Sequence, residues 1–359
     1  MNKQIYNNKE EEYRQHPGIN VSKLKTLAKG VNKYKEELET EKSSQELLLG
    51  KVVDVMLTAE QSVFEDTFIV LEDSIEVPTE KSFDIVYKLY DTLLESGIEM
   101  TERMLDYEAQ LIDILENTDW YKNRKMETRL ESIFNYSDYF GFLVRAKGKT
   151  VITNKVFETA TKIKESIKNT EATRKYFFSE FIEEDTLIFY QVPIYFELLN
   201  RNPQDNAQAK TLLDFVIVNT KNKTIRGGDL KTLSDSCINF KNNVISFRYD
   251  IQAAFYTEAL LYAIQHNLDI FGIDLTNYQV NSSFLFVVES TKYIGNPVIY
   301  ESDETVLGSG TYGRRSADGK YVYAKGYLEL VDELNYVNKI DFATDKIIHE
   351  NKNVLTLSL

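Results

Sequence analysis

Apolar and β-branched residues follow one another through the middle of the chain in a pattern typical of strands. Residues 212–218 are β-prone on both sides of Asp214, and residues 219–224 form a polar, turn-prone connection. Residues 284–289 alternate with the period of a strand. We therefore predict that strands dominate residues 186–232 and that a further strand occupies residues 284–289.

Helical periodicity is found on both sides of this block. Apolar residues recur at helical spacing through residues 78–128, which is typical of a helical insertion, and Ser22 is placed to cap a first helix. The predicted helices span residues 22–38, 45–57, 156–173 and 251–262, and residues 78–128 are predicted to form a helical insertion or subdomain. The order helix, strands, helix, strand predicts an α/β (α+β) fold with a mixed central sheet flanked by helices.

The composition limits the class of protein. A chain of 359 residues with 43% hydrophobic content can bury a proper core. The single cysteine, Cys237, excludes an internal disulfide and a four-cysteine iron–sulphur cluster, and we expect it to be a passive residue. His16, His266 and His349 lack zinc-ligand spacing and are predicted to be structural or exposed. The polar N-terminal residues contain no segment suited to secretion or membrane insertion, so a cytoplasmic protein without a membrane partner is expected.

One strand combines two carboxylates with a lysine. Asp229 and Lys231 are two apart on a predicted strand and share a face, and symmetric pairing about the turn places Asp214 opposite Asp229. Carboxylate oxygens are ligands for a hard divalent cation, and an ammonium beside the attacking water stabilises developing charge. The pattern predicts a site for metal-dependent phosphodiester hydrolysis. Its simpler alternative is a surface ion pair between Asp229 and Lys231.

The neighbouring sequence adds support to that site. Gly227 and Gly228 precede Asp229 and indicate either a bulge or a close backbone approach. Gln252 and Tyr256 are four apart on a predicted helix, so they share a face. Either side chain can hydrogen-bond a phosphate or order the strand of Asp229.

These residues carry a resemblance to a known family. The order Asp214, then Asp229-Leu230-Lys231-Thr232, then Tyr249, Gln252 and Tyr256 resembles the PD-(D/E)xK nuclease superfamily in its branch with the Q-x-x-x-Y motif. Within that branch the chain looks most like the phage-type RecE-like (exodeoxyribonuclease VIII-like) exonucleases.

Further positions match the same family. Ser22 in Val21-Ser22-Lys23-Leu24-Lys25 is similar to its early helix start, and Glu197 matches an acidic position upstream of the first aspartate. Asp54 stands where the family has the histidine of a Gly-x-x-x-His helix, with either a ligand role or a place on the polar edge of the helix. The basic residue often found just before the first aspartate is absent, which leaves Lys210 as the nearest cation.

The resemblance implies a complete site and fold. Asp214, Asp229 and Lys231 would be catalytic, and Mg²⁺, with Mn²⁺ as a possible substitute, would be held by the two aspartates with the Leu230 carbonyl, Glu197 and Asp54 as further ligands. The residues expected to bind DNA or support the site are Gln252, Tyr256, Tyr249, Thr232, Lys210 and Ser22. The domains implied are an N-terminal helical region at 1–150 that contributes to the active site, a nuclease core at 151–300, and a C-terminal extension at 301–359.

The expected function is therefore a Mg²⁺-dependent exonuclease that resects double-stranded DNA ends to single strands for phage or plasmid recombination. A single-strand annealing protein is an implied partner, and a homo-oligomer is an implied assembly. The alternatives are a structure-specific endonuclease and an inactive nuclease-fold subunit that binds DNA or supports assembly.

Charge and glycine patterns bear on DNA contact. The net charge of −14 opposes binding of a polyanion unless cations are confined to one channel. A basic run between Lys23 and Lys35 provides such cations or, alternatively, a solvated helix face. The glycine-rich residues 308–313 lack Walker-lysine spacing and are predicted to form a turn, and Arg314 and Arg315 after it are candidates for contact with the DNA backbone.

Overall fold

The computed structural model describes residues 4–6, 10–39, 44–198, 207–317 and 322–339. Contacts divide the chain into two compact units. The first comprises Met1–Ala59 and Lys162–Leu359, and the second comprises Glu60–Thr161. In the part of the chain that the structure describes, no helix combines the length and apolarity that a membrane span needs. We call the unit of Met1–Ala59 and Lys162–Leu359 the sheet unit, and the unit of Glu60–Thr161 the helical unit.

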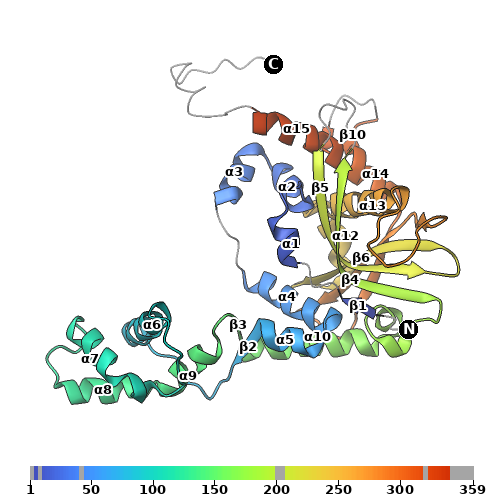
Figure 1. The fold of residues 1–359 in the computed structure, drawn as a ribbon. Coiled ribbons are helices and arrows are strands. Elements are labelled where there is room, and N and C mark those ends of the chain that lie inside the picture. The colour runs from blue at the N-terminus through green and yellow to red at the C-terminus, as the bar shows by residue number, and fades with distance from the viewer. Residues whose placement is uncertain (1–3, 7–9, 40–43, 199–206, 318–321, 340–359) are drawn as a thin grey trace, which may run out of the picture. The chain divides into compact units, whose positions relative to one another are not determined.

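A mixed sheet forms the centre of the sheet unit (Figure 1). Its strands are β1 (Gln4–Tyr6), β4 (Thr186–Leu198), β5 (Ala207–Asn219), β6 (Thr224–Leu233), β7 (Gln279–Val280), β8 (Phe284–Ser290) and β9 (Val298–Ser302). The order is β1-β4-β5-β6-β8-β9, with β7 also paired to β6. The β4–β5 and β5–β6 pairs are antiparallel, whereas β8 lies parallel to β6 after the chain crosses over through α13 (Tyr249–Gln265). The predicted mixed sheet flanked by helices is confirmed.

Helices pack against this sheet because their apolar residues have few other places to be buried. Almost every residue in the first two turns of α13 is buried, and its side chains join those of β4, β6 and β8 in one core. The other helices of the sheet unit are α1 (Glu10–Gln15), α2 (Val21–Leu27), α3 (Val31–Glu39), α4 (Gln45–Thr58), α11 (Glu171–Arg174), η2 (Ser179–Phe181), η4 (Cys237–Asn239), α12 (Phe240–Ser246), α14 (Glu304–Tyr312) and α15 (Tyr327–Lys339). A short hairpin is formed by β10 (Arg314–Arg315) and β11 (Val322–Ala324).

The first predicted helix is wrong in its cap and in its length. Asn20, not Ser22, accepts the hydrogen bond from the Lys23 amide at 3.0 Å and caps α2. The helix ends at Leu27 because Gly30, at a φ of +120°, turns the chain before α3 begins. The predicted helix at residues 45–57 is confirmed as α4.

The glycine-rich turn predicted at residues 308–313 is also wrong. These residues lie almost entirely within α14, which packs closely against α13. A Cβ atom at Gly310 would lie 2.0 Å from the carbonyl oxygen of Asp250. Glycine is therefore required here for helix packing rather than for chain reversal. The glycines that predicted a turn in the sequence are instead explained by the contact between α13 and α14.

The helical unit has its own core. Its elements are α5 (Gln61–Thr67), β2 (Phe68–Leu71), α6 (Glu80–Glu95), η1 (Met104–Tyr107), α7 (Glu108–Glu116), α8 (Met126–Phe134), α9 (Ser137–Arg145) and β3 (Thr150–Thr153), and α10 (Asn154–Asn169) contains the boundary with the sheet unit. Phe140 is fully buried among Leu89, Leu111 and Ile133. The predicted helical character of residues 78–128 is confirmed. The division at residues 150 and 300 stays a prediction.

Candidate functional site

The two aspartates lie across from each other where β5 and β6 stop pairing. The register runs from Asn219↔Thr224 to Phe215↔Gly228, so the next facing residues are Asp214 and Asp229, as predicted. In place of a backbone bond, Asp214 Oδ2 accepts the Leu230 amide at 2.8 Å. The amide and carbonyl of an extended residue point to the same side, so the Leu230 carbonyl is also directed toward β5. Two carboxylates and one backbone carbonyl thus lie close together where the ladder ends.

The glycines before Asp229 permit this strand pairing. The register of β5 and β6 is continuous, so the bulge alternative is wrong and close approach is confirmed. A Cβ atom at Gly228 would lie 2.1 Å from the ring of Phe215, and one at Gly227 would lie 2.7 Å from the ring of Phe284. Larger side chains would therefore force β6 away from its neighbours.

Asp229 is held from two directions. Gln252 on α13 donates from Nε2 to Asp229 Oδ1 at 2.5 Å, and Lys231 Nζ lies 2.5 Å from Asp229 Oδ2. The carboxyl side chain is only 3% exposed and that of the lysine 19%. The hydrogen bond to Oδ1 and the ion pair at Oδ2 together orient Asp229 and leave the lysine at the edge of the site. Gln252 thus orders the strand that carries Asp229.

The site contains more negative charge than Lys231 neutralises. Burial and the nearby carboxylates of Asp229 and Asp54 hold the pKa of Asp214 well above its usual value, although Lys231 and the Leu230 amide act in the opposite direction. Burial works against the Lys231 ammonium, but Asp229 and Asp214 outweigh it and raise its pKa. A lysine that stays charged beside crowded carboxylates is the electrostatic arrangement of a site that receives a further cation.

Asp54 is hydrogen-bonded to Gln191, a residue that the sequence did not single out. Gln191 on β4 donates from Nε2 to Asp54 Oδ2 at 2.6 Å. It adopts a φ of +51° in the middle of a strand, although it is buried and is not a glycine. Nothing in the local sequence indicates this conformation, because it depends on the pairing of β4 with β5 and on the position of α4.

Lys25 also joins the site, with Tyr249 between it and Lys231. The ammonium of Lys25 lies 4.5 Å from the centre of the Tyr249 ring and that of Lys231 lies 5.0 Å from it. Burial and the charge of Lys231 lower the pKa of Lys25 to about 7. The basic run is therefore not a uniformly solvated face, since one of its lysines turns inward.

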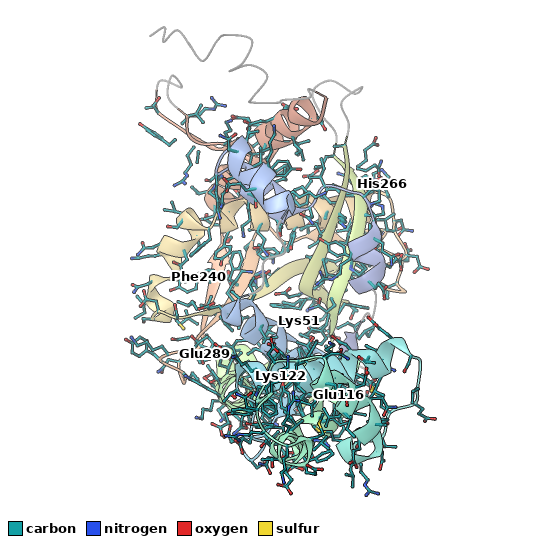
Figure 2. All side chains as sticks on the ribbon, turned by 90° about the vertical axis from the view of Figure 1, so that its left-hand side faces the viewer. Lys51, Glu116, Lys122, Phe240, His266 and Glu289 are labelled. Atoms are coloured by element: carbon teal, nitrogen blue, oxygen red, sulfur yellow. The ribbon has the colours of Figure 1, made fainter. Side chains whose placement is uncertain are left out.

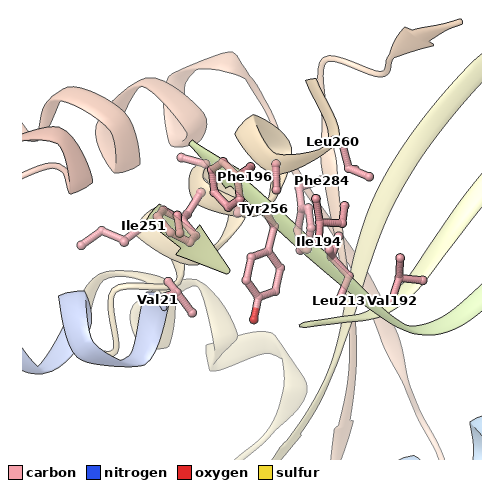
Figure 3. Packing of buried hydrophobic residues seen from close by; sticks show 14 of the residues in the cluster. Val21, Val192, Ile194, Phe196, Leu213, Ile251, Tyr256, Leu260 and Phe284 are labelled. Atoms are coloured by element: carbon pink, nitrogen blue, oxygen red, sulfur yellow. The ribbon is translucent and has the colours of Figure 1, made fainter. Parts of the chain in front are cut away.

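The remaining support residues lie on the same elements. Tyr256, one turn after Gln252 on α13, extends its hydroxyl away from the packed apolar side chains (Figure 3). Burial raises its pKa well above the usual value, and Asp229 and Asp214 act in the same direction. Thr232 lies beside α4, with its Oγ1 3.6 Å from the position of a Cβ atom at Gly50.

Three predicted residues are not brought to the site. Glu197 is paired with Gln208, six residues along the sheet from the level of Asp214, or roughly 20 Å at the rise of a strand. Lys210 is buried and donates to the carbonyls of Tyr13 and His16, each at 2.6 Å, so it caps the end of α1. Ser22 is exposed on α2 and does not cap it.

The other predicted candidates have local contacts. Cys237 is buried and lies 3.5 Å from the Val288 carbonyl. His16 packs against Tyr195, and His266 stacks on Tyr262. Arg315 forms an ion pair with Glu329. His349 lies outside the described residues.

The donor set fits a magnesium ion. Among the described residues, no group of three or more His, Cys, Asp and Glu side chains is arranged to hold a metal. The candidate ligands are two carboxylates and one backbone carbonyl. This number is sufficient for Mg²⁺, which commonly takes one or two carboxylates and completes its shell with water and substrate phosphate. Asp214, Asp229 and Leu230 would hold it, and the excess negative charge around Asp214 favours a cation there.

Comparisons with known proteins give little further information. No protein-family model matches this sequence, and no curated protein matches it. The chain is similar to a solved structure from Eubacterium rectale that is described as a candidate exonuclease, with 14% identity, a TM-score of 0.39, and coverage of 97% of this chain and 86% of that one.

Proposed function

We propose that the protein is a metal-dependent deoxyribonuclease that hydrolyses phosphodiester bonds at the ends of double-stranded DNA. One observation carries the proposal: the β5–β6 register brings Asp214, Asp229 and Lys231 together at the end of the ladder, where Gln252 fixes Asp229. These are the residues in which the sequence resembles the RecE-like exonucleases.

Each side chain has a distinct part in that reaction. A bound Mg²⁺ would supply an acidic metal-bound water and offset charge on the leaving oxygen. Asp214 and Asp229 would hold the cation, and the Leu230 carbonyl would add a neutral oxygen. Gln252 keeps Asp229 in one orientation. Lys231, oriented by Asp229, places a positive charge where the phosphate becomes more negative during attack.

The physiological setting follows from the resemblance. We propose that the protein exposes single strands for phage or plasmid recombination, acts with a single-strand annealing protein and assembles as a homo-oligomer. A cytoplasmic location is part of the same proposal.

The decisive experiment compares linear and covalently closed duplex DNA of the same sequence, each incubated with Mg²⁺ and with chelator. We expect only the linear DNA to be degraded, and only with the metal. End-labelled duplex reports the direction of digestion. Cleavage of the closed form would favour the endonuclease alternative. Binding of DNA with both forms left intact would favour the inactive subunit.

A further inference from the structure

Phe247 is a large apolar side chain left in solvent next to the candidate site. It is 51% exposed, although it follows α12 directly and precedes the buried start of α13. Its ring centre lies 5.9 Å from that of Tyr249. Tyr249 in turn lies 5.0 Å from the ammonium of Lys231, which pairs with Asp229. Three short steps therefore connect the exposed ring to the proposed metal ligands.

The backbone turn that exposes Phe247 is held in place by hydrogen bonds from other segments. Arg248 adopts a left-handed conformation, with φ of 55°, that a non-glycine residue seldom takes. Its guanidinium is buried and donates to Asp250 at 3.0 Å and to the Lys325 carbonyl at 2.6 Å. Ser309 also donates to Asp250, at 2.9 Å. Contacts from α14 and the β11 segment thus hold the one residue that separates Phe247 from Tyr249.

The reversal at Arg248 sends the two rings into different surroundings. Tyr249 packs inward against Phe240 and Phe286, with ring centres 5.5 and 5.8 Å away, and contacts the ammonium of Lys25. Phe247 stays at the rim. The result is an exposed aromatic ring that is separated from the Lys231 ammonium by the ring of Tyr249.

That combination is typical of proteins that hold an unpaired nucleic-acid strand. Cations follow the phosphate backbone, and aromatic rings stack on the bases, whichever bases they are. A phosphate near Lys231 would lie one aromatic ring, that of Tyr249, away from Phe247, which brings the base of a neighbouring nucleotide within reach of Phe247. An aromatic ring in water gains by such stacking because one face of the ring and one face of the base lose contact with solvent.

We propose that Phe247 is a stacking platform for a nucleobase of the DNA strand that enters the site, and that the locked Arg248 turn positions it. This inference rests on the proposed nuclease function and adds a base-binding position to it. The ligand is an unpaired nucleotide, so recognition does not depend on which base is present.

The test measures binding of a single-stranded oligonucleotide of about 12 nucleotides in chelator, where no cleavage occurs. Its 2-aminopurine base is moved along the strand to report stacking by quenching. Phe247→Ala should weaken binding roughly 5- to 100-fold and remove the quenching at one position. Phe247→Trp should restore both. Tyr87→Ala, which removes an exposed aromatic ring of the helical unit, is the control and should change neither.

An abasic nucleotide at the quenched position makes the test specific. Wild-type protein should lose affinity for this oligonucleotide, whereas Phe247→Ala should bind it as it binds the intact strand, because the same contact is already missing. Equal quenching and affinity in Phe247→Ala and wild type would overturn the platform while leaving the nuclease proposal in place. This outcome would instead fit an apolar surface used by a protein partner. Wild-type protein that neither binds nor cleaves DNA would overturn both.

Discussion

The sheet unit and the helical unit differ most in charge. Residues 60–161 contain 21 acidic and 11 basic residues, a net charge of −10, whereas the rest of the chain contains 35 and 31, a net charge of −4. Glu116 and Lys122 belong to the helical unit, and Lys51 belongs to the sheet unit (Figure 2). Most of the charge that opposes DNA binding therefore belongs to the unit without the candidate site. Net charge of a whole chain is a poor guide when the chain folds as two units.

The units also differ in how their polar groups are used. The sheet unit buries Asp229, Gln252 and Asp250 in bonds to other side chains. The core of the helical unit is mainly aliphatic and aromatic, and ion pairs such as Arg145–Glu102 are exposed. A buried polar network lowers stability unless every group in it is hydrogen-bonded. The concentration of such groups in the sheet unit therefore indicates a functional site there, whereas the apolar core of the helical unit indicates a structural role.

The largest expected effect comes from the lysine of the site. Lys231→Ala should lower the turnover of linear DNA by roughly 10³-fold or more, because its charge no longer stabilises the transition state. Metal binding measured by calorimetry should persist. Lys122→Ala in the helical unit removes an exposed ammonium and is the matched control, with turnover unchanged. Wild-type turnover in Lys231→Ala would remove the lysine from the mechanism.

The next effect tests whether the helical unit is held by its own core. Phe140→Ala leaves a cavity where the ring is fully buried and should destabilise that unit by about 3–5 kcal/mol. Calorimetry should show two transitions, of which only one shifts to lower temperature. A single transition that moves as a whole would indicate that the two units unfold together.

Lys25 gives the sheet unit a predicted pH dependence. Because burial lowers its folded pKa to about 7 from 10.5, the unfolded chain binds more protons between those values. Stability should therefore rise with pH from about 7 to 10.5, when measured in chelator. Lys25→Met should remove that slope and stabilise the protein below pH 7 by on the order of 2 kcal/mol, after the lost contact with Tyr249 is counted. Lys88→Met in the helical unit should leave the slope unchanged.

A smaller effect is expected at Gln191. Gln191→Asn keeps an amide and tolerates a positive φ, but it is one methylene too short to reach Asp54. We expect turnover to fall about tenfold, the cost of one hydrogen bond to a charged group. Asp54→Asn should give a similar loss and the double variant little more. Fully additive losses would show that the two residues act separately.

The smallest effect concerns the charge of the helical unit. Glu116→Gln combined with Glu131→Gln removes two of its exposed negative charges. At physiological salt, charges separated by more than about 8 Å are largely screened, so the affinity for DNA should change less than about twofold. Anisotropy titrations at low and physiological salt check this. A fivefold gain at physiological salt would mean that this unit does repel the substrate.

The sequence alone determined the elements whose signals are local. Strand alternation and the polar turn at residues 219–224 fixed which residues of β5 and β6 face each other, so the opposition of Asp214 and Asp229 was predictable. The Ala- and Leu-rich helix placed Gln252 and Tyr256 on one face for the same reason. Periodicity and symmetric pairing are properties of short segments, and no distant contact was needed to read them.

Tertiary structure decided the rest. Gln191 meets Asp54 across 137 positions of sequence, and Lys25 turns inward because α2 packs beside Tyr249. The glycines at 308–313 looked like a turn but allow two helices to touch, and Glu197 matched a motif but lies far along its strand. For Gln191, Lys25 and the glycines, the deciding energy is a close contact or a buried charge between remote segments. Such interactions exist only after the sheet has formed, so no local pattern contains them.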